Sequence, residues 1–263
     1  MGGLIDVHCH LTGADYDSVG GVEEVVKRAL SSGVERIVCS GFDLDSSKES
    51  ARLSERFDEV YFSAGFHPSE LAKYKEGDFQ AFESLWKHEK CVAVGEIGLD
   101  YHFEDNPPKE TQREFFLRQL TSADELGLPV VIHSRDAAQE TLEILTENKN
   151  LLKKGGIMHC YSYSPEMLPS FASLGLSFSF GGPTTFKNAR KAVESVAVTP
   201  ADRLLTETDC PYLTPVPKRG VFPNEPENVR FVAEKLAEIR GENKEEFKKR
   251  TLENAKRLFF KLK

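Results

Sequence analysis

The sequence lacks the long apolar segments that membrane and secreted proteins need. None of its apolar runs reaches about 18 residues, the length at which a membrane-spanning helix becomes possible. The first residues also lack the basic segment followed by an apolar one that marks a secretory signal. We therefore expect a cytoplasmic protein without a membrane partner.

Cysteine is scarce and irregularly spaced. The chain has five cysteines, and no two of them form a C-x-x-C pair. This pattern argues against a disulfide scaffold or a zinc ribbon and is typical of a reducing compartment. All five lie in or beside apolar, strand-like segments, so we interpret them as buried thiols: Cys9, Cys39, Cys91, Cys160 and Cys210.

An excess of positive charge is also missing. The chain has 34 Lys and Arg against 42 Asp and Glu, which gives a net charge of −8. Proteins that coat duplex nucleic acid by releasing counterions are expected to be basic. The composition therefore argues against a broad DNA-binding surface. It does not exclude a nucleic-acid end that enters a pocket, particularly where metal ions neutralise its phosphates.

No Gly/Ser/Pro-rich linker, internal repeat or low-complexity segment interrupts the chain. Instead, short runs rich in Val, Ile and Phe alternate with longer amphipathic stretches. The apolar runs predict strands at residues 4–8, 36–40, 60–66, 91–97, 129–133, 156–159, 176–180 and 203–208. The amphipathic stretches predict helices at residues 22–31, 45–57, 79–88, 109–126, 137–149, 165–173, 189–196, 227–239 and 244–262.

Eight strands that alternate with helices predict an α/β fold, a single (β/α)8 TIM-barrel domain over residues 1–263. The length is close to the roughly 250 residues typical of that fold. An open doubly wound sheet would favour a glycine-rich phosphate loop after the first strand. Here the first strand ends in His8-Cys9-His10, so the barrel is preferred.

Histidines and carboxylates gather where the predicted strands end, which is where such a barrel builds its active site. Five of the seven histidines occupy these positions. The two-residue period of a strand would place His8 and His10 on one side and Cys9 on the other. The remaining strand ends supply His67, Glu96, Asp100, His133, Arg135, Asp136, His159, Glu207 and Asp209.

Six of these residues suit two metal ions better than one, because a catalytic ion typically has three protein ligands and an open position. The six are His8, His10, Glu96, His133, His159 and Asp209. One ion would take the histidines of the first strand and Asp209, the other would take the remaining two histidines, and Glu96 would bridge both. Paired ions of this kind lie about 3.5–4 Å apart and lower the pKa of bound water. The pattern therefore predicts metal-assisted hydrolysis, with Asp209 accepting the proton of the attacking water.

Each of these residues alone has an ordinary explanation. A histidine at a strand end is often a hydrogen-bonded core residue, and Asp209 could cap the turn before Pro211. A buried Glu96 would cost several kcal/mol of desolvation unless it were paired, and the segment VAVGEIGLD offers no local cation. We favour the metal centre because all the ordinary explanations would have to hold together at one end of a barrel.

The motifs that contain these residues are DVHCHL, GFHP, VGEIGLDY, VIHSRDA, MHCYS and TETDCPYLTPVPKRGVFPNEP. With TLENAKRLF near the C-terminus, the chain resembles the TatD family of metal-dependent deoxyribonucleases, which are amidohydrolase-like barrels. The resemblance implies a divalent-metal site at the six residues given above. It also places His67, Arg135 and Arg219 near a bound phosphate, and it implies hydrolysis of DNA phosphodiester bonds, often from the 3′ end, with magnesium commonly used.

We therefore predict a two-metal deoxyribonuclease that acts as a monomer on DNA ends or short single strands, with Asp209 and Glu96 as catalytic residues. Four imidazoles favour zinc or manganese over magnesium, so the two divalent ions could be Mg, Zn or Mn. One alternative is an amidohydrolase that cleaves a C–N bond of a small cyclic amide or base. A second is a non-catalytic barrel that binds DNA or RNA without cleaving it.

Overall fold

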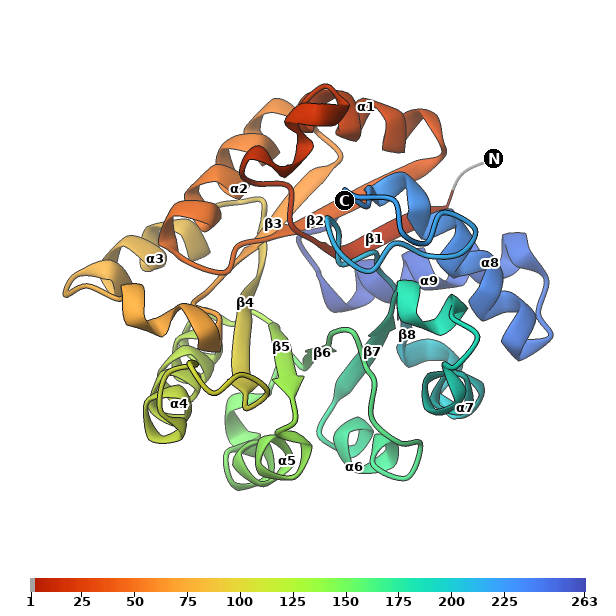
Figure 1. Cartoon of the computed structure of the whole chain (residues 1–263). Coiled ribbons are helices and arrows are strands. Elements are labelled where there is room, and N and C mark those ends of the chain that lie inside the picture. Colours follow the sequence, from red (N-terminus) through yellow and green to blue (C-terminus); the bar gives the residue numbers. More distant parts are fainter. Residues whose placement is uncertain (1–2) are drawn as a thin grey trace. The chain divides into compact units, whose positions relative to one another are not determined.

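The computed structural model describes residues 3–263, whose strands form one sheet in the order β1 to β8 (Figure 1). The strands are β1 (Leu4–Cys9), β2 (Val34–Ser40), β3 (Val60–Ala64), β4 (Cys91–Asp100), β5 (Val130–Arg135), β6 (Gly156–Met158), β7 (Leu176–Phe180) and β8 (Leu204–Thr206). Neighbouring strands pair in parallel. The last strand returns to the first, where Thr206 Oγ1 donates to the Ile5 carbonyl at 2.7 Å. This order is that of a (β/α)8 TIM barrel, so the predicted fold class is confirmed.

Helices follow the strands as the amphipathic pattern predicts. They are α1 (Val22–Ser31), α2 (Leu44–Arg56), α3 (Asp78–Trp86), α4 (Lys109–Leu126), α5 (Ala138–Glu147), α6 (Leu168–Ser173), α7 (Arg190–Val198), α8 (Val229–Arg240) and α9 (Lys244–Leu258). The predicted bounds of α1 and α4 agree with the structure, and the others differ by a few residues at their ends. None of the helices within residues 3–263 is long and apolar enough to cross a membrane.

The chain forms two compact units, each assembled from separate stretches of sequence. The first unit comprises Met1–Cys39, Cys160–Pro169 and Phe178–Arg257, and the second comprises Ser40–His159, Ser170–Ser177 and Leu258–Lys263. Their boundaries fall within regular elements such as α6, β7 and α9 and not at a flexible linker. The single domain over residues 1–263 stays a prediction.

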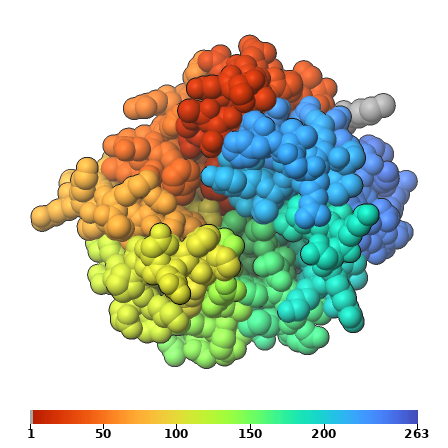
Figure 2. Space-filling view, in the orientation of Figure 1, coloured from red at the N-terminus to blue at the C-terminus, as the bar shows by residue number. Residues whose placement is uncertain are grey.

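In the first unit, the segment that follows β8 lies against the end of β1. The His10 amide donates to the Cys210 carbonyl at 2.7 Å, and the Asp209 amide donates to the His8 carbonyl at 3.0 Å. Figure 2 shows the light-blue segment after β8 beside the red segment after β1 on one face. The ends of these two strands are thereby fixed relative to each other.

In the second unit, strands β3 to β6 lie side by side, and helices α4 and α5 lie outside β4 and β5 (Figure 1). All ten residues of β4 are buried, as expected of a parallel strand that is covered on both faces. Helix α2 begins with a capping box, in which Asp43 accepts from the Ser46 amide at 2.8 Å and the Ser46 hydroxyl accepts from the Asp43 amide at 2.9 Å. The unit therefore offers rigid strand ends on which side chains can be positioned.

Candidate metal centre

Three of the predicted ligands converge in the first unit. The Nε2 atoms of His8 and His10 are 3.3 Å apart, and Asp209 Oδ1 lies 3.5 Å from the first and 3.4 Å from the second. The two rings are nearly perpendicular, at 89°. His8 is buried, whereas the other two side chains keep a small exposed area. We call His8, His10 and Asp209 the first ligand set.

The local backbone explains why these three side chains meet. The pairing of β1 with β2 shifts register between Asp6 and Cys9, a bulge that re-aims the side chains at the strand end. Asp209 has a positive φ of 54°, a left-handed conformation that aspartate tolerates better than most residues. Cys9 is fully buried, and its thiol donates to the Val38 carbonyl at 3.5 Å. It packs against β2 while its histidine neighbours turn toward Asp209.

A second convergence lies in the second unit. Glu96 Oε1 is 2.9 Å from His133 Nδ1 and 2.8 Å from His159 Nε2, and these two nitrogens are 3.2 Å apart. Glu96 and His159 are buried. We call Glu96, His133 and His159 the second ligand set. The structure thus brings the six predicted ligands together as two sets of three.

The position of Glu96 depends on an irregular strand. The register of β4 against β5 shifts between Val94 and Ile97, so a bulge precedes the straight end of the strand. Gly98 then passes so close to β5 that an added Cβ would lie 1.9 Å from the His133 carbonyl oxygen. Only glycine allows this approach, and its φ of 143° is one that other residues rarely adopt. The bulge and the glycine together place Glu96 and His133 in contact.

Asp100, at the end of β4, supports the second ligand set. Its Oδ2 lies 3.1 Å from His133 Nε2, and its Oδ1 accepts from the His102 amide at 2.9 Å. Burial would raise the pKa of Asp100, but the hydrogen bonds from His133 and the backbone lower it. Burial would lower the pKa of His133, but hydrogen bonds to Asp100 and Glu96 raise it. A carboxylate that fixes the second ring nitrogen of a ligating histidine is a common supporting element of metal sites.

Asp6 plays a comparable part beside the first ligand set. Its carboxylate accepts from the Thr208 hydroxyl at 2.5 Å and from the Thr208 amide at 3.0 Å. This fixes the residue immediately before Asp209. Neither Asp6 nor the role of Asp100 follows from our sequence reasoning. The sequence does contain one signal for both residues. Asp6 is two residues from His8 and Asp100 is four residues from Glu96, and an even spacing along a strand places two side chains on the same face.

His67, predicted to lie near a bound phosphate, contacts the second ligand set. Its Nε2 is 3.4 Å from Glu96 Oε1, and its Nδ1 lies 2.7 Å from the Ser69 hydroxyl. Burial, together with the neighbouring His133, lowers the pKa of His67 to about 3. The ring is therefore neutral near pH 7, and it would meet a phosphate as a hydrogen-bond donor and not as a cation.

The two predicted arginines are exposed, and each stacks on an aromatic ring. Arg135 Cζ lies 5.0 Å from the centre of the Phe103 ring in the second unit. Arg219 Cζ lies 4.1 Å from the centre of the Phe186 ring in the first unit. Stacking of this kind restrains a guanidinium without consuming its hydrogen-bond donors.

The donor atoms of the first ligand set fit a metal ion well. Three ligands at the 2.0–2.1 Å bond lengths of tetrahedral zinc would lie about 3.3–3.4 Å apart, and the observed separations are 3.3, 3.4 and 3.5 Å. In the second ligand set the separations of 2.8–3.2 Å are those of hydrogen bonds. That set would expand by a few tenths of an ångström around an ion.

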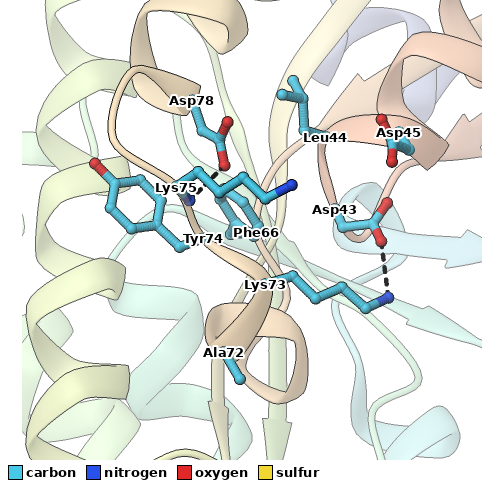
Figure 3. Close-up of a pocket in the computed structure, with 9 residues that line it drawn as sticks. All are labelled: Asp43, Leu44, Asp45, Phe66, Ala72, Lys73, Tyr74, Lys75 and Asp78. Atoms are coloured by element: carbon cyan, nitrogen blue, oxygen red, sulfur yellow. Dashed lines mark hydrogen bonds and ion pairs between the residues drawn. The ribbon is translucent and has the colours of Figure 1, made fainter.

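A separate cavity of about 350 Å³ lies in the second unit (Figure 3). Its walls include Asp43, Phe66, Lys73 and Tyr74, and none of its lining residues belongs to the predicted site. Figure 3 shows Lys73 extended toward Asp43, with an ion pair of 3.0 Å. Because these charges satisfy each other, we assign the cavity no ligand.

Comparison with known proteins identifies the family of the chain. A family model described as TatD related DNase matches residues 5–260. The chain belongs to the TatD-related DNase family. The resemblance inferred from the motifs is therefore confirmed, and the matched residues include both ligand sets.

Curated relatives of this family cover nearly the whole chain. An uncharacterized metal-dependent hydrolase of Bacillus subtilis, YabD, is 45% identical over 256 residues, which are 97% of this chain and 98% of the relative. The uncharacterized metal-dependent hydrolase YcfH of Escherichia coli K12 is 38% identical, over 97% of this chain and 95% of its own. A Citrobacter koseri relative named 3′-5′ ssDNA/RNA exonuclease TatD is 31% identical, over 97% and 98%. The chain is thus a metal-dependent hydrolase of the TatD family.

Solved structures of the TatD family show the same fold. The crystal structure of YjjV, a TatD homologue from Escherichia coli K12, superposes with a TM-score of 0.91 at 30% identity, covering 98% of each chain. A TatD family hydrolase from Entamoeba histolytica superposes with a TM-score of 0.86 at 21% identity, covering 98% of each chain. At 21% identity, the similarity to the Entamoeba histolytica protein shows a shared fold alone.

Proposed function

We propose that this TatD-family hydrolase is a two-metal deoxyribonuclease that shortens single-stranded DNA from its 3′ end. The observation that carries the proposal is the first ligand set, whose three donor atoms are spaced as ligands around one ion. Support comes from the second ligand set and from the relative named as a 3′-5′ ssDNA/RNA exonuclease. The bridging role of Glu96 is part of the proposal.

Divalent ions bound by the two ligand sets would supply Lewis acidity at neutral pH. Asp209 joins the first ligand set through Oδ1, so its Oδ2 would accept the proton of an attacking water. Among the first ligand set Asp209 and His10 retain exposed area, which gives water and substrate access. Asp100 holds the proton of His133 on Nε2, so that Nδ1 is the nitrogen available for an ion.

The two arginines would bind the phosphates of the substrate. A guanidinium matches the geometry of a phosphate with two parallel hydrogen bonds. Arg135 and Arg219 are exposed and restrained by ring stacking, so both can reach substrate with little loss of entropy. His67 would add a neutral donor beside Glu96. These local roles are compatible with a chain whose net charge is negative.

The nature of the ions, the assembly state and the location are parts of the proposal as well. Imidazole-rich sets favour zinc or manganese, whereas magnesium prefers oxygen ligands. We propose two divalent ions, a monomer, and a cytoplasmic location that suits five free thiols.

The proposal is tested with oligonucleotides labelled at the 5′ end. Protein loaded with Mg²⁺, Mn²⁺ or Zn²⁺ should give a ladder that shortens from the 3′ end of single-stranded DNA. Asp209→Asn and Glu96→Gln should slow the reaction at least about 100-fold, the lower range for loss of a proton-transfer group. The matched control is Glu55→Gln, which alters an exposed carboxylate beside His88, at 3.6 Å, and should leave the rate unchanged.

Elemental analysis accompanies the assay. Two metal equivalents in the wild type, with fewer in both site variants, are expected. A metal-loaded protein that leaves single-stranded DNA intact with all three ions would overturn the nuclease proposal. Ring opening of a cyclic amide, or release of ammonia from an amino-substituted base, by the same preparation would favour the amidohydrolase alternative.

A further inference from the structure

The segment 211–226, which follows β8, carries an unusual amount of exposed apolar surface. Among residues 3–263, eight large hydrophobic side chains are exposed, and five of them belong to this segment: Tyr212, Leu213, Val216, Val221 and Phe222. Single exposed apolar residues need no explanation, but a contiguous group marks a binding surface. Tyr212 and Phe222 are 56% and 58% exposed, and their ring centres are 6.4 Å apart.

Buried anchors hold this segment in place. Asn224 is fully buried, and its side chain donates to the carbonyls of Thr208 and Tyr212 at 3.2 and 2.7 Å. The Thr214 hydroxyl donates to the Val221 carbonyl at 2.6 Å, which ties the two halves of the segment together. An added Cβ on Gly182 would lie 1.8 Å from the Leu213 carbonyl oxygen, so the segment also packs closely on the end of β7. The exposed rings are therefore presented on a fixed scaffold.

The segment that carries the rings is hydrogen-bonded to a member of the first ligand set. Tyr212 lies three residues after Asp209 in the chain, and its amide donates to the Asp209 carbonyl at 3.1 Å. The same segment contains Arg219, whose guanidinium is held over Phe186. Aromatic faces, a restrained cation and a metal-ligating carboxylate thus occur within one short stretch of chain in the first unit. This is the composition of surfaces that bind single-stranded nucleic acid, where bases stack on rings and cations follow the phosphates.

We propose that Tyr212 and Phe222 form a stacking platform for the bases at the 3′ end of a single-stranded nucleic acid. The proposal rests on the nuclease function proposed above and names its substrate-binding surface. Stacking on a ring face is tolerant of sequence because every base has such a face. Paired bases in a duplex have their faces covered, so the platform would favour single strands or frayed ends. The protein would therefore select substrate by base exposure and not by base identity.

The platform is tested by combining removal of a ring from the protein with removal of the bases from the substrate. The Michaelis constant for 3′ shortening is measured on an oligonucleotide with normal 3′-terminal residues and on a matched one with abasic 3′-terminal residues. Tyr212→Ala and Phe222→Ala should raise KM on the normal oligonucleotide about 5- to 150-fold, the range for loss of one stacked base. They should leave KM on the abasic oligonucleotide, and kcat on both, nearly unchanged. Tyr212→Trp and Phe222→Trp should retain the wild-type KM.

The matched control is Phe260→Ala. Phe260 is exposed to a similar extent, 55%, but belongs to the second unit near the C-terminus. Its replacement should change KM on neither oligonucleotide. Circular dichroism melts of each variant verify that the fold is retained.

The outcomes are distinguishable. Equal changes of KM on normal and abasic oligonucleotides, or no change on either, would overturn the platform while leaving the nuclease function intact. A wild-type dimer that becomes a monomer in Phe222→Ala would overturn it in favour of a contact between copies of the chain. If wild-type protein cleaves neither oligonucleotide, the nuclease function fails, and the same comparison is made on binding by fluorescence anisotropy. Binding that is insensitive to base removal would then overturn the platform too.

Discussion

Replacing Asp100 with asparagine isolates one supporting hydrogen bond of the second ligand set. Asp100 accepts from two donors, His133 Nε2 at 3.1 Å and the His102 amide at 2.9 Å. Asparagine has one acceptor oxygen in place of two, so either orientation of its amide leaves one of these donors unsatisfied. The backbone of residue 100 stays bound to the Gln112 side chain, at 2.8 and 3.0 Å, so the strand end is retained.

We expect Asp100→Asn to weaken metal binding moderately, by less than the loss of a ligand would. The carboxylate fixes the tautomer of His133 but donates no ligand atom in this arrangement. Loss of such a partner typically costs about 10- to 100-fold in metal affinity or activity. Isothermal titration of metal-free Asp100→Asn with Zn²⁺ or Mn²⁺ should therefore show one weakened site and one unchanged site. Activity at saturating metal should recover in part.

The matched control for this experiment is again Glu55→Gln, because it alters another carboxylate close to a histidine ring, at the surface. It should leave both affinities unchanged. A loss of three or more orders of magnitude in Asp100→Asn would mean that Asp100 is itself a ligand. Unchanged affinity would mean that His133 does not depend on it. Either result would refute the reasoning.

Three further predictions follow from the same geometry. His8→Ala should lower bound metal by about one equivalent, and elemental analysis showing two retained equivalents would contradict the first ligand set. In metal-free protein, burial lowers the pKa of His133, but the hydrogen bonds to Asp100 and Glu96 together outweigh burial and leave this pKa raised. The stability that the ring contributes is therefore complete below about pH 6.5 and is lost as pH rises through the folded pKa. Urea melts of wild type minus His133→Gln should show that decline, and a difference that grows with pH would refute it. Gly98→Ala should lower the free energy of unfolding by more than about 2 kcal/mol, because a clash with the His133 carbonyl adds to the cost of a positive φ. The control is Gly77→Ala, because Gly77 also has a positive φ but has open space around an added Cβ. It should lower the free energy of unfolding by less in the same melts.

The alternation of apolar and amphipathic segments was sufficient to predict the barrel. Helices α1 and α4 were predicted with their observed bounds because glycine or proline marks their ends: Gly21 precedes α1, and Pro108 and Gly127 flank α4. Strand ends were less accurate. Strand β4 continues three residues beyond the predicted end at 97, and β3 stops at Ala64 before the turn that contains His67. Pairing with neighbouring strands determines such ends, and a single sequence does not contain that information.

The convergence of side chains within each ligand set was predictable, because neighbouring parallel strands end at the same edge of a sheet, whichever side chains they carry. The supporting residues were not. The bulges in β1 and β4 break the two-residue period on which a strand-face argument depends. The contact of His67 with Glu96, and the hydrogen bond from His133 to Asp100, depend on these local shifts. Sequence spacing could suggest that a carboxylate was near, but not which ring nitrogen it would hold.

Because hydrogen bonds join β1 to the segment after β8, the first ligand set can be completed only after most of the chain has been synthesised. The first ligand set needs residues near both ends of the chain, from 8 to 209, whereas the second lies between 96 and 159. At about 5–20 residues per second, some 10–40 s separate translation of the first histidine pair from that of its aspartate. Until then the nascent chain carries His8 and His10 as a two-ligand chelate without its carboxylate. The three-donor geometry is a property of the nearly finished chain, so this ion can enter its complete site only late in synthesis or afterwards.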